Sequence, residues 1–268
     1  MGVVASVPLS VRADDDPGTA LLFVTASVDG ADEEFLLDTG ASRSRIPHSD
    51  RTRAWAADAP DADSRGVFAS TSTATQARVP TIRLGTIEAH DVVVDLSESE
   101  AGPPAVLGVD VLAGHRVGVR PSAGTLQLDE QAAIDRWRPL GLSSRGHPLV
   151  EVVWDAVTAV AVWDTGAATT VVDTDLAASF PGLFAPTGAT GTGTDVHGQE
   201  STTARLRVAP CRIGGRRFAA SSAVTVPLSG LAREGDTPFT MIIGYPLIVQ
   251  ADWVFDFRAR MWGYLDRG

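Results

Sequence analysis

The sequence contains no lysine, and all 22 of its basic residues are arginine. Reaction mechanisms that need a catalytic lysine are therefore excluded. The 33 acidic residues give the chain a net charge of −11. Binding to a nucleic-acid backbone or to an anionic membrane needs clustered positive charge. We therefore expect neither nucleic acid nor a membrane as a partner.

Cysteine is nearly absent, and long apolar runs are missing. The single cysteine, Cys211, cannot form a disulfide within the chain, so the fold does not depend on an oxidising compartment. It lies in the segment VAPCRIGG without an apparent histidine partner, which favours a half-buried thiol on a strand over a nucleophile. No stretch reaches the roughly 18 apolar residues of a membrane span, and the first residues do not read as a signal peptide. These features predict a soluble, cytoplasmic chain.

Motifs for metal or phosphate binding are also missing. The five histidines, at positions 48, 90, 115, 147 and 197, show no HxH or HExxH spacing, so we expect no metal site and no cofactor. The segment GTGTDVHG is rich in glycine but lacks the preceding apolar strand, the following helix and the lysine of a phosphate loop. A flexible hairpin tip is the better interpretation. Arg212, Arg216 and Arg217 lie beside a turn and are interpreted as a solvated edge.

Short segments rich in valine, threonine and isoleucine recur along the whole chain between clusters of Gly, Pro, Asp and Ser. The predicted strands are 20–30, 33–40, 79–85, 91–97, 148–156, 158–166, 203–210, 221–230 and 251–265. Such spacing is typical of an all-β barrel or sandwich. Helices are predicted only at 130–137, at 174–180 and in the turns after Gly108 and Gly244. The 268 residues fit one large β unit or two lobes of roughly 100 to 150 residues each.

An internal repeat divides the chain into two halves. FLLDTGAS around Asp38 returns 126 residues later as AVWDTGAA around Asp164, and residues 22–42 align with 148–168 without a gap. Each half then has an apolar pair followed by glycine, VLGVDVL around Gly108 and IIGYPLI around Gly244, and afterwards a closing strand. We therefore predict an N-terminal lobe over 1–128, a linker over 129–146 and a C-terminal lobe over 147–268.

The DTG motifs have a chemical explanation. An apolar run before an aspartate suits a buried strand whose end delivers a carboxylate into the interior, where an unpaired charge would be costly. Threonine offers a hydroxyl to a neighbouring backbone, and glycine permits a tight turn. If the halves face each other about a pseudo-twofold axis, Asp38 and Asp164 become neighbours. Two adjacent carboxyl groups share a proton, so one serves as general base and the other as general acid toward a water.

At these residues the chain resembles the aspartic proteases over nearly its whole length. The DTGA form, with alanine after glycine, is more similar to the retropepsins and their bacterial relatives than to the pepsins. Retropepsins are homodimers that supply one aspartate each, so this chain resembles a fused, single-chain version with the two-lobed organisation of pepsin. The resemblance implies an all-β, two-lobed, pepsin-like fold with pseudo-twofold symmetry, in which each lobe is a retropepsin-like β-barrel.

The resemblance also implies the site and the reaction. Asp38 and Asp164 would form the catalytic dyad of a monomeric aspartic endopeptidase that needs no cofactor and cleaves an extended peptide or protein. Support for the two loops would come from Thr39, Gly40, Thr165, Gly166, Gly108 and Gly244.

Flap hairpins would close over the peptide at 66–76 and 188–201. Neither segment contains the tyrosine of a pepsin flap, because the only tyrosines are Tyr245 and Tyr264. A catalytically weak or inactive peptide-binding module of the same fold therefore remains an alternative. A purely structural pair of β-sandwiches would leave the matching aspartates unexplained.

Overall fold

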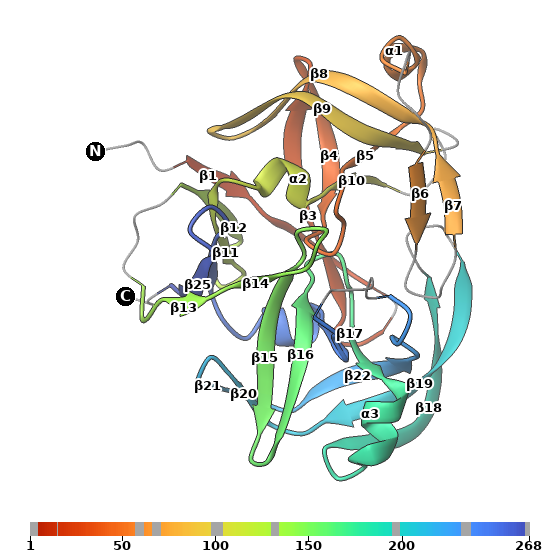
Figure 1. Ribbon diagram of the computed structural model, residues 1–268, viewed down its shortest axis with the longest axis vertical. Coiled ribbons are helices and arrows are strands. Elements are labelled where there is room, and N and C mark those ends of the chain that lie inside the picture. Colours follow the sequence, from red (N-terminus) through yellow and green to blue (C-terminus); the bar gives the residue numbers. More distant parts are fainter. Residues whose placement is uncertain are drawn as a thin grey trace.

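The structure is a computed structural model of the chain. It describes residues 5–14, 16–56, 62–65, 71–97, 104–129, 134–194, 199–231 and 237–265. Most of these residues are in strands, arranged as two lobes that lie one above the other in Figure 1. The predicted all-β, two-lobed fold is confirmed. No helix in this part of the chain is long and apolar enough to cross a membrane.

The first lobe is a closed six-stranded barrel. Its strands, in order around the ring, are β3 (Ala20–Val28), β4 (Ala31–Leu37), β10 (Ala105–Leu107), β5 (Arg45–Pro47), β9 (Ile87–Ser97) and β8 (Gln76–Leu84). The last of these, β8, pairs again with β3 and closes the ring. Outside the ring, β2 (Ser10–Ala13) extends the sheet next to β3. Closure removes the exposed edges of the sheet and encloses an apolar core.

The second lobe repeats this strand order. Its ring contains β15 (Pro148–Trp154), β16 (Val157–Trp163), β23 (Met241–Ile243), β17 (Thr170–Asp173), β22 (Ser221–Val226) and β19 (Glu200–Val208). After Ala209 and Pro210, the chain continues as β20 (Cys211–Ile213), which pairs with β15. Proline has no backbone N–H to donate, so the interruption at this point is expected. The ring therefore closes through β19 and the three-residue β20, where the first lobe uses β8 alone.

Three further strands belong to the second lobe. They are β14 (Gly141–Leu142), β18 (Phe184–Thr194) and β21 (Arg216–Phe218). The first pairs with β15, the second with β19 and the third with β20. Because β14 and the preceding β13 (Arg138–Pro139) both lie inside 129–146 and pair with other strands, the predicted linker contains paired strands. Its boundaries stay a prediction.

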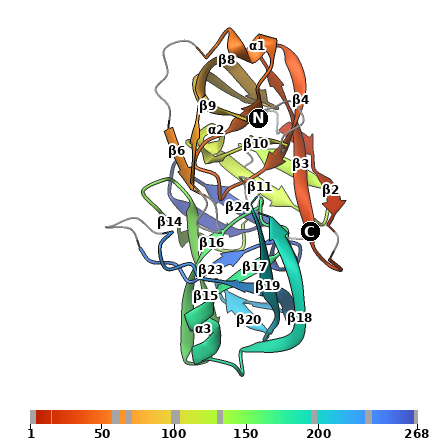
Figure 2. The ribbon, with the colours of Figure 1, turned by 90° about the vertical axis from the view of Figure 1, so that its right-hand side faces the viewer.

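A third, six-stranded sheet joins the two lobes. Its order is β1 (Ala5–Pro8), β12 (Thr125–Leu128), β11 (Arg116–Arg120), β24 (Trp253–Asp256), β25 (Met261–Tyr264) and β13 (Arg138–Pro139). The central pair, β11 with β24, connects the two halves of the chain and places Val117 opposite Phe255. We call this the interlobe sheet. It lies on the left of Figure 1, and Figure 2 shows β11 and β24 between the lobes.

Two hairpins lie on the other side of the molecule, on the right of Figure 1. One consists of β6 (Ala62–Arg65) and β7 (Thr71–Ala74), and the other of β18 and β19. The two predicted flap segments fall on these hairpins. Residues 66–70 and 195–198 lie outside the described residues. The strands on either side of them form hairpins, and the role of these hairpins as flaps stays a prediction.

The described residues also form four short helices. They are α1 (Asp50–Arg53), α2 (Val109–Leu112), α3 (Thr174–Ser179) and α4 (Tyr245–Ile248). Three were predicted, and α1, which begins at a Ser49 capping box, was not. The predicted helix at 130–137 is wrong for its described part. Ile134 forms a β-bridge with Leu265, and Asp135 accepts a hydrogen bond from the Tyr264 N–H. Pairing with the interlobe sheet overrides the local helix propensity of this segment.

Candidate active site

The two predicted aspartates lie at the ends of equivalent strands. Asp38 follows β4, and its N–H donates to the carbonyl of Leu107 on β10 at 3.0 Å. Asp164 follows β16, and its N–H donates to the carbonyl of Ile243 on β23, also at 3.0 Å. In both lobes the two strands are parallel neighbours. Each aspartate is thus held by the buried strand that it follows and by the neighbouring parallel strand. That neighbour, β10 or β23, ends just before Gly108 or Gly244.

The two DTG loops are bonded to each other through their threonines. The Thr39 hydroxyl donates to the carbonyl of Trp163 at 2.6 Å and accepts from the Thr165 N–H at 3.1 Å. In return, the Thr165 hydroxyl accepts from the Thr39 N–H at 3.1 Å. Both threonines are buried, with exposures of 2% and 1%. Buried hydrogen bonds of this kind fix the loops relative to each other, because breaking them would leave polar groups unsatisfied.

The glycines of the motifs make room for the opposite carboxyl group. A Cβ atom on Gly40 would lie 2.4 Å from Oδ2 of Asp164, and one on Gly166 would lie 2.3 Å from Cγ of Asp38. The Gly40 N–H donates to Oδ1 of Asp38 at 2.9 Å and to Oδ1 of Asp164 at 3.2 Å. The Gly166 N–H donates to Oδ1 of Asp164 at 2.8 Å. The structure therefore brings Asp38 and Asp164 together and surrounds them with backbone donors.

The downstream glycines pack against the backbones of the same loops. A Cβ on Gly108 would lie 2.8 Å from the carbonyl oxygen of Ala41, and one on Gly244 would lie 2.2 Å from the carbonyl oxygen of Thr169. Any side chain at either position would push the DTG loop out of place. The structure thus places Gly108 and Gly244 behind the DTG loops, as the sequence predicts.

Two hydroxyl residues behind the loops were missed by the sequence reasoning. The Gly108 N–H donates to Oγ of Ser44 at 3.0 Å, and the Gly244 N–H donates to Oγ1 of Thr170 at 3.3 Å. Each hydroxyl residue stands six positions after the aspartate of its motif, and that matched spacing was the available signal. In the first lobe the carboxylate of Asp110 also accepts from the backbone and hydroxyl of Ser44, at 2.9 and 2.7 Å.

The environment raises the pKa of both aspartates. For Asp38, which is 4% exposed, burial is the largest cause, while a hydrogen bond from Asp164 and the Gly40 N–H act in the opposite direction. For Asp164, burial is again the largest cause, and the charge of Asp38 and the hydrogen bond to it raise the pKa further, well above its ordinary value. Two neighbouring carboxyl groups that share one proton have this pattern.

A charged side chain distinguishes the first lobe from the second. Arg45 on β5 lies opposite Val106, which lies beside Leu36 on β4, two residues before Asp38. Neighbours in register share a face of the sheet, so Arg45 lies on the face of Asp38. The positive charge of Arg45 lowers the pKa of Asp38, against the larger effect of burial. The equivalent position in the second lobe is Val171, opposite Ile242. Sequence reasoning missed Arg45, because its role depends on strand register.

Apolar clusters flank the two aspartates on the same sheet faces. The first-lobe cluster contains the buried residues Phe23, Leu36 and Val106. The second-lobe cluster contains the buried residues Leu149, Val162, Val171, Val226, Leu228 and Ile242. Both are separate from the main core, and each includes the residue two positions before its aspartate. The dyad therefore lies between two apolar surfaces.

The remaining sequence candidates are structural. Cys211 on β20 is buried, more deeply than the predicted half-buried position, and burial raises the pKa of its thiol to about 12. A thiol with this pKa is a poor nucleophile at neutral pH. Trp154 and Trp163 are core residues with exposures of 5% and 0%.

Family comparisons agree with the geometry of the two loops. Residues 24–114 match the family described as "gag-polyprotein putative aspartyl protease", and residues 150–247 match the family described as "Aspartyl protease". The two matches contain the two DTG motifs and their downstream glycines. A comparison with curated proteins found no match. The chain therefore belongs to the aspartic proteases of retropepsin-like type, with two such domains in tandem.

Proposed function

We propose that this protein is an aspartic endopeptidase in which Asp38 and Asp164 activate a water for attack on a peptide bond. The observation that carries the proposal is the hydrogen-bonded pair of carboxyl groups at the junction of the lobes, with their pKa values raised unequally. Residues 1–128 and 147–268 would be the lobes that each supply one aspartate. Since both come from one chain, a monomer would be active, and the reaction would need no cofactor.

The charge of Arg45 on the face of Asp38 assigns the starting roles, because it favours the ionised form of that carboxyl group. Asp38 begins as the charged base and accepts a proton from the water, whose oxygen attacks the peptide carbonyl carbon. Asp164 begins protonated and donates its proton to the carbonyl oxygen, which gives a neutral tetrahedral diol. Asp38 then passes its proton to the amide nitrogen, the C–N bond breaks, and one diol hydroxyl returns its proton to Asp164. The products are a carboxylic acid and an amine, and the dyad regains its starting state.

Substrate binding would use the surfaces around the dyad. The apolar clusters beside Asp38 and Asp164 would accept apolar side chains on either side of the scissile bond. The β6–β7 and β18–β19 hairpins would offer backbone groups to an extended peptide, in the manner of an added strand. The substrate would therefore be an extended peptide or an unfolded segment of a protein.

Peptide cleavage by matched variants tests this proposal. Wild type, Asp38→Asn and Asp164→Asn are incubated with a mixed peptide library, because an amide can serve as neither acid nor base. Asp32→Asn is the matched control, since Asp32 is exposed on β4 and remote from the dyad. We expect cleavage by wild type and the control, and none by the two dyad variants. Activity retained in either dyad variant would contradict the proposal.

A catalytically inactive peptide-binding module is the second candidate. It is favoured by the absence of tyrosine from the two hairpin segments, since Tyr245 begins α4 and Tyr264 lies on β25. A statine-type peptide, which mimics the tetrahedral intermediate, separates the two candidates. An active protease should bind it and be inhibited by it. Binding of ordinary peptides without cleavage, and without preference for the mimic, would support the second candidate.

A further inference from the structure

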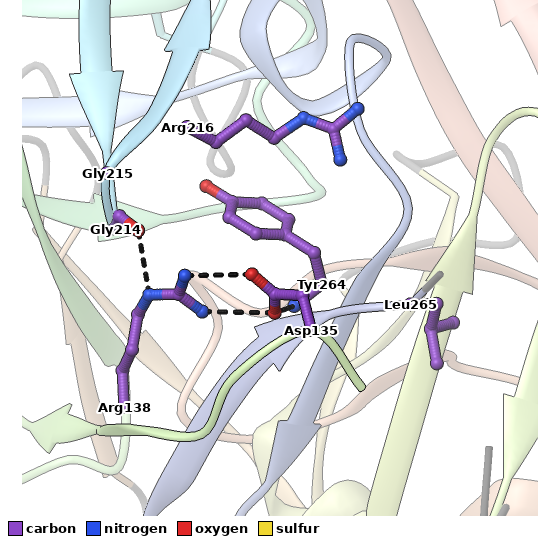
Figure 3. A pocket seen from close by; sticks show the side chains of 7 residues that line it. All are labelled: Asp135, Arg138, Gly214, Gly215, Arg216, Tyr264 and Leu265. Carbon is purple, nitrogen blue, oxygen red and sulfur yellow. Dashed lines mark hydrogen bonds and ion pairs between the residues drawn. The ribbon is translucent and has the colours of Figure 1, made fainter. Parts of the chain in front are cut away.

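A second site candidate lies away from the two aspartates, at the edge of the interlobe sheet. It is a cavity of about 520 Å³, within the size range of small-ligand sites. Figure 3 shows its lining. The lining residues come from β13 and the segment before it, from the end of β25 and the next residue, and from the β20–β21 hairpin. The residues are Asp135, Arg138, Gly214, Gly215, Arg216, Tyr264 and Leu265. None belongs to the DTG loops or to the apolar clusters beside the dyad.

The one acidic residue in this lining is already neutralised. Arg138 donates to the two carboxylate oxygens of Asp135 at 3.2 and 2.9 Å, and the Tyr264 N–H donates to the same carboxylate at 3.0 Å. Burial by itself would raise the pKa of Asp135, but these hydrogen bonds outweigh it and lower the pKa. The Nε of Arg138 also donates to the carbonyl of Gly214 at 2.8 Å. Asp135 and Arg138 therefore form a closed pair.

Arg216 supplies a positive charge that this pair does not balance. Its guanidinium carbon lies 5.2 Å from the centre of the Tyr264 ring, and that of Arg138 lies 5.3 Å from the same centre. In Figure 3, Arg216 and the Arg138–Asp135 pair lie on opposite sides of the ring. Within the described part of the chain, no ion pair includes Arg216. The cavity therefore carries a net positive charge in a protein whose net charge is −11.

The hairpin turn gives this cavity its shape. Gly214 and Gly215 both have positive φ, +54° and +86°. A Cβ on Gly214 would lie 2.6 Å from Nε of Arg138, so the contact of Arg138 with the turn requires glycine. A Cβ on Gly215 would meet nothing within 4 Å, so space remains next to the turn. The solvated edge predicted for the three arginines is correct for Arg212 and Arg217, which are exposed, but Arg216 turns into the cavity.

We infer that this cavity binds an anionic group, a carboxylate or phosphate of a small ligand, with Arg216 as its charged partner. A guanidinium presents paired N–H donors that match two oxygens of either group. The cation–π contact with Tyr264 holds this guanidinium at the wall of the cavity. The open space next to Gly215 leaves room for the rest of the ligand.

Isothermal titration of the full chain tests the site with two probes, inorganic phosphate and succinate, at constant ionic strength set with sodium chloride. Arg216→Gln is compared with Arg217→Gln, which removes the same charge from the next residue of β21 but not from the cavity lining. We expect one saturable site per chain for at least one probe. Its affinity should fall about tenfold or more in Arg216→Gln and stay unchanged in Arg217→Gln. The probe that binds identifies the anion class.

Two outcomes would overturn the inference: no saturable binding of either probe, or an equal loss in both variants, which would indicate a general charge effect. The arginine Nε–Hε NMR signal of Arg216 in the wild-type chain gives an independent reading that needs no variant, and it should shift on binding. Asp38→Asn should bind the probe as tightly as wild type does. The inference and the proposed peptidase activity can therefore fail separately.

Discussion

At the scale of single residues, Asp38 and Asp164 occupy equivalent places but different electrostatic environments. The first has Arg45 on the same sheet face, whereas the second has Val171 at the matching position. The Gly40 N–H also reaches both carboxyl groups, whereas the Gly166 N–H donates to Asp164 alone. The two loops are thus similar, but the surrounding residues give their carboxyl groups different environments.

Removing the charge of Arg45 should shift the pH dependence of activity. Burial is the main cause of the raised pKa of Asp38, and Arg45 partly opposes it. Arg45→Val, which copies the second lobe, removes this opposition, so the pKa of Asp38 rises. The base then ionises at higher pH, and the low-pH limb of kcat/KM should move upward. Arg83→Gln is the control, because it removes the same charge from an exposed position on β8. It should leave the low-pH limb of kcat/KM where it is in wild type. A downward or absent shift in Arg45→Val would contradict the assignment of Asp38 as the base.

The dyad should also reduce stability at neutral pH. A folded-state pKa above the unfolded value means that the folded chain binds more protons between the two values, so the free energy of unfolding falls as pH rises through that window. Above the folded-state pKa, the free energy of unfolding is reduced by the full cost of keeping the second carboxyl group ionised. Asp164→Asn removes the repulsion, so it should be as stable as wild type or more stable near pH 7.

Urea melts of wild type and Asp164→Asn near pH 7 and near pH 3.5 measure this effect. The difference between them should shrink at the lower pH, which is below the unfolded aspartate pKa of about 3.9. A carboxylate that only held the turn through hydrogen bonds would give the opposite sign. In that case the variant would lose about 1–3 kcal/mol at neutral pH.

The glycine of each motif is needed for the approach of the opposite carboxyl group. In Gly166→Ala the new methyl group would lie 2.3 Å from Cγ of Asp38, so the two loops must separate. We expect loss of peptidase activity and a decrease of about 1–3 kcal/mol in the free energy of unfolding, as is usual for overpacking. Gly182→Ala is the control, because its methyl group would meet nothing within 4 Å. Comparable activity in both variants would argue against close contact of the loops.

At the scale of elements, strand ends and turns determine which residues meet. The hairpin β3–β4 and its equivalent β15–β16 turn at Asp29 and Asp155, both with positive φ, which aspartate tolerates better than most residues. These turns set the register that delivers Asp38 and Asp164 to the same level at the strand ends. Asp29 and Asp155 are identical in the aligned halves, and this identity falls at a position of special backbone geometry.

The contact between the loops can be tested through Thr39. In Thr39→Ala, the carbonyl of Trp163 and the N–H of Thr165 lose their partner, and both are buried. We expect this variant to be less stable by about 1–3 kcal/mol, with reduced activity because the lobes are no longer fixed together. Thr39→Ser keeps the hydroxyl and should remain close to wild type in both respects. Chemical denaturation and a peptidase assay measure the two effects, and equal behaviour of the variants would remove the hydroxyl from the explanation.

The sequence was sufficient to predict the strands next to the DTG motifs, the meeting of Asp38 with Asp164 and the glycines behind the two loops. The strands follow from local periodicity, and the meeting of the loops follows from the repeat, which implies two similar halves that face each other. Arg45 was missed because only strand register places it on the face of Asp38. The helix predicted at 130–137 was wrong because Ile134 pairs with Leu265, far along the chain. Apart from the meeting of the two DTG loops, which the repeat implies, contacts between distant segments could not be derived from the sequence pattern.

At the scale of the whole molecule, the interlobe sheet and the aromatic side chains packed against it connect the two halves of the chain. Trp163, which precedes Asp164, lies 4.4 Å from Phe255 and 5.6 Å from Trp253 between ring centres. Both partners lie on β24, which pairs with β11 of the first half. The strand that carries the second aspartate therefore packs directly on the sheet that joins the lobes.

A single chain should be sufficient for activity, because the two aspartates and both sides of the interlobe sheet come from the same molecule. Sedimentation velocity combined with a peptidase assay of each fraction tests this expectation. Activity should follow the monomer and stay constant per mole on dilution. Activity confined to a dimer fraction would mean that a second chain completes the site.

The position of β24 in the chain also determines the order of events during synthesis. It follows every strand of the second barrel, so the first lobe leaves the ribosome with β11 uncovered on one side and with a single aspartate. The nascent chain has a single DTG loop until the second half is made. Neighbouring ribosomes on one messenger present identical first lobes, each with the same open strand and the same DTG loop. Folding of the second lobe covers that strand within its own chain, because β24 then pairs with β11.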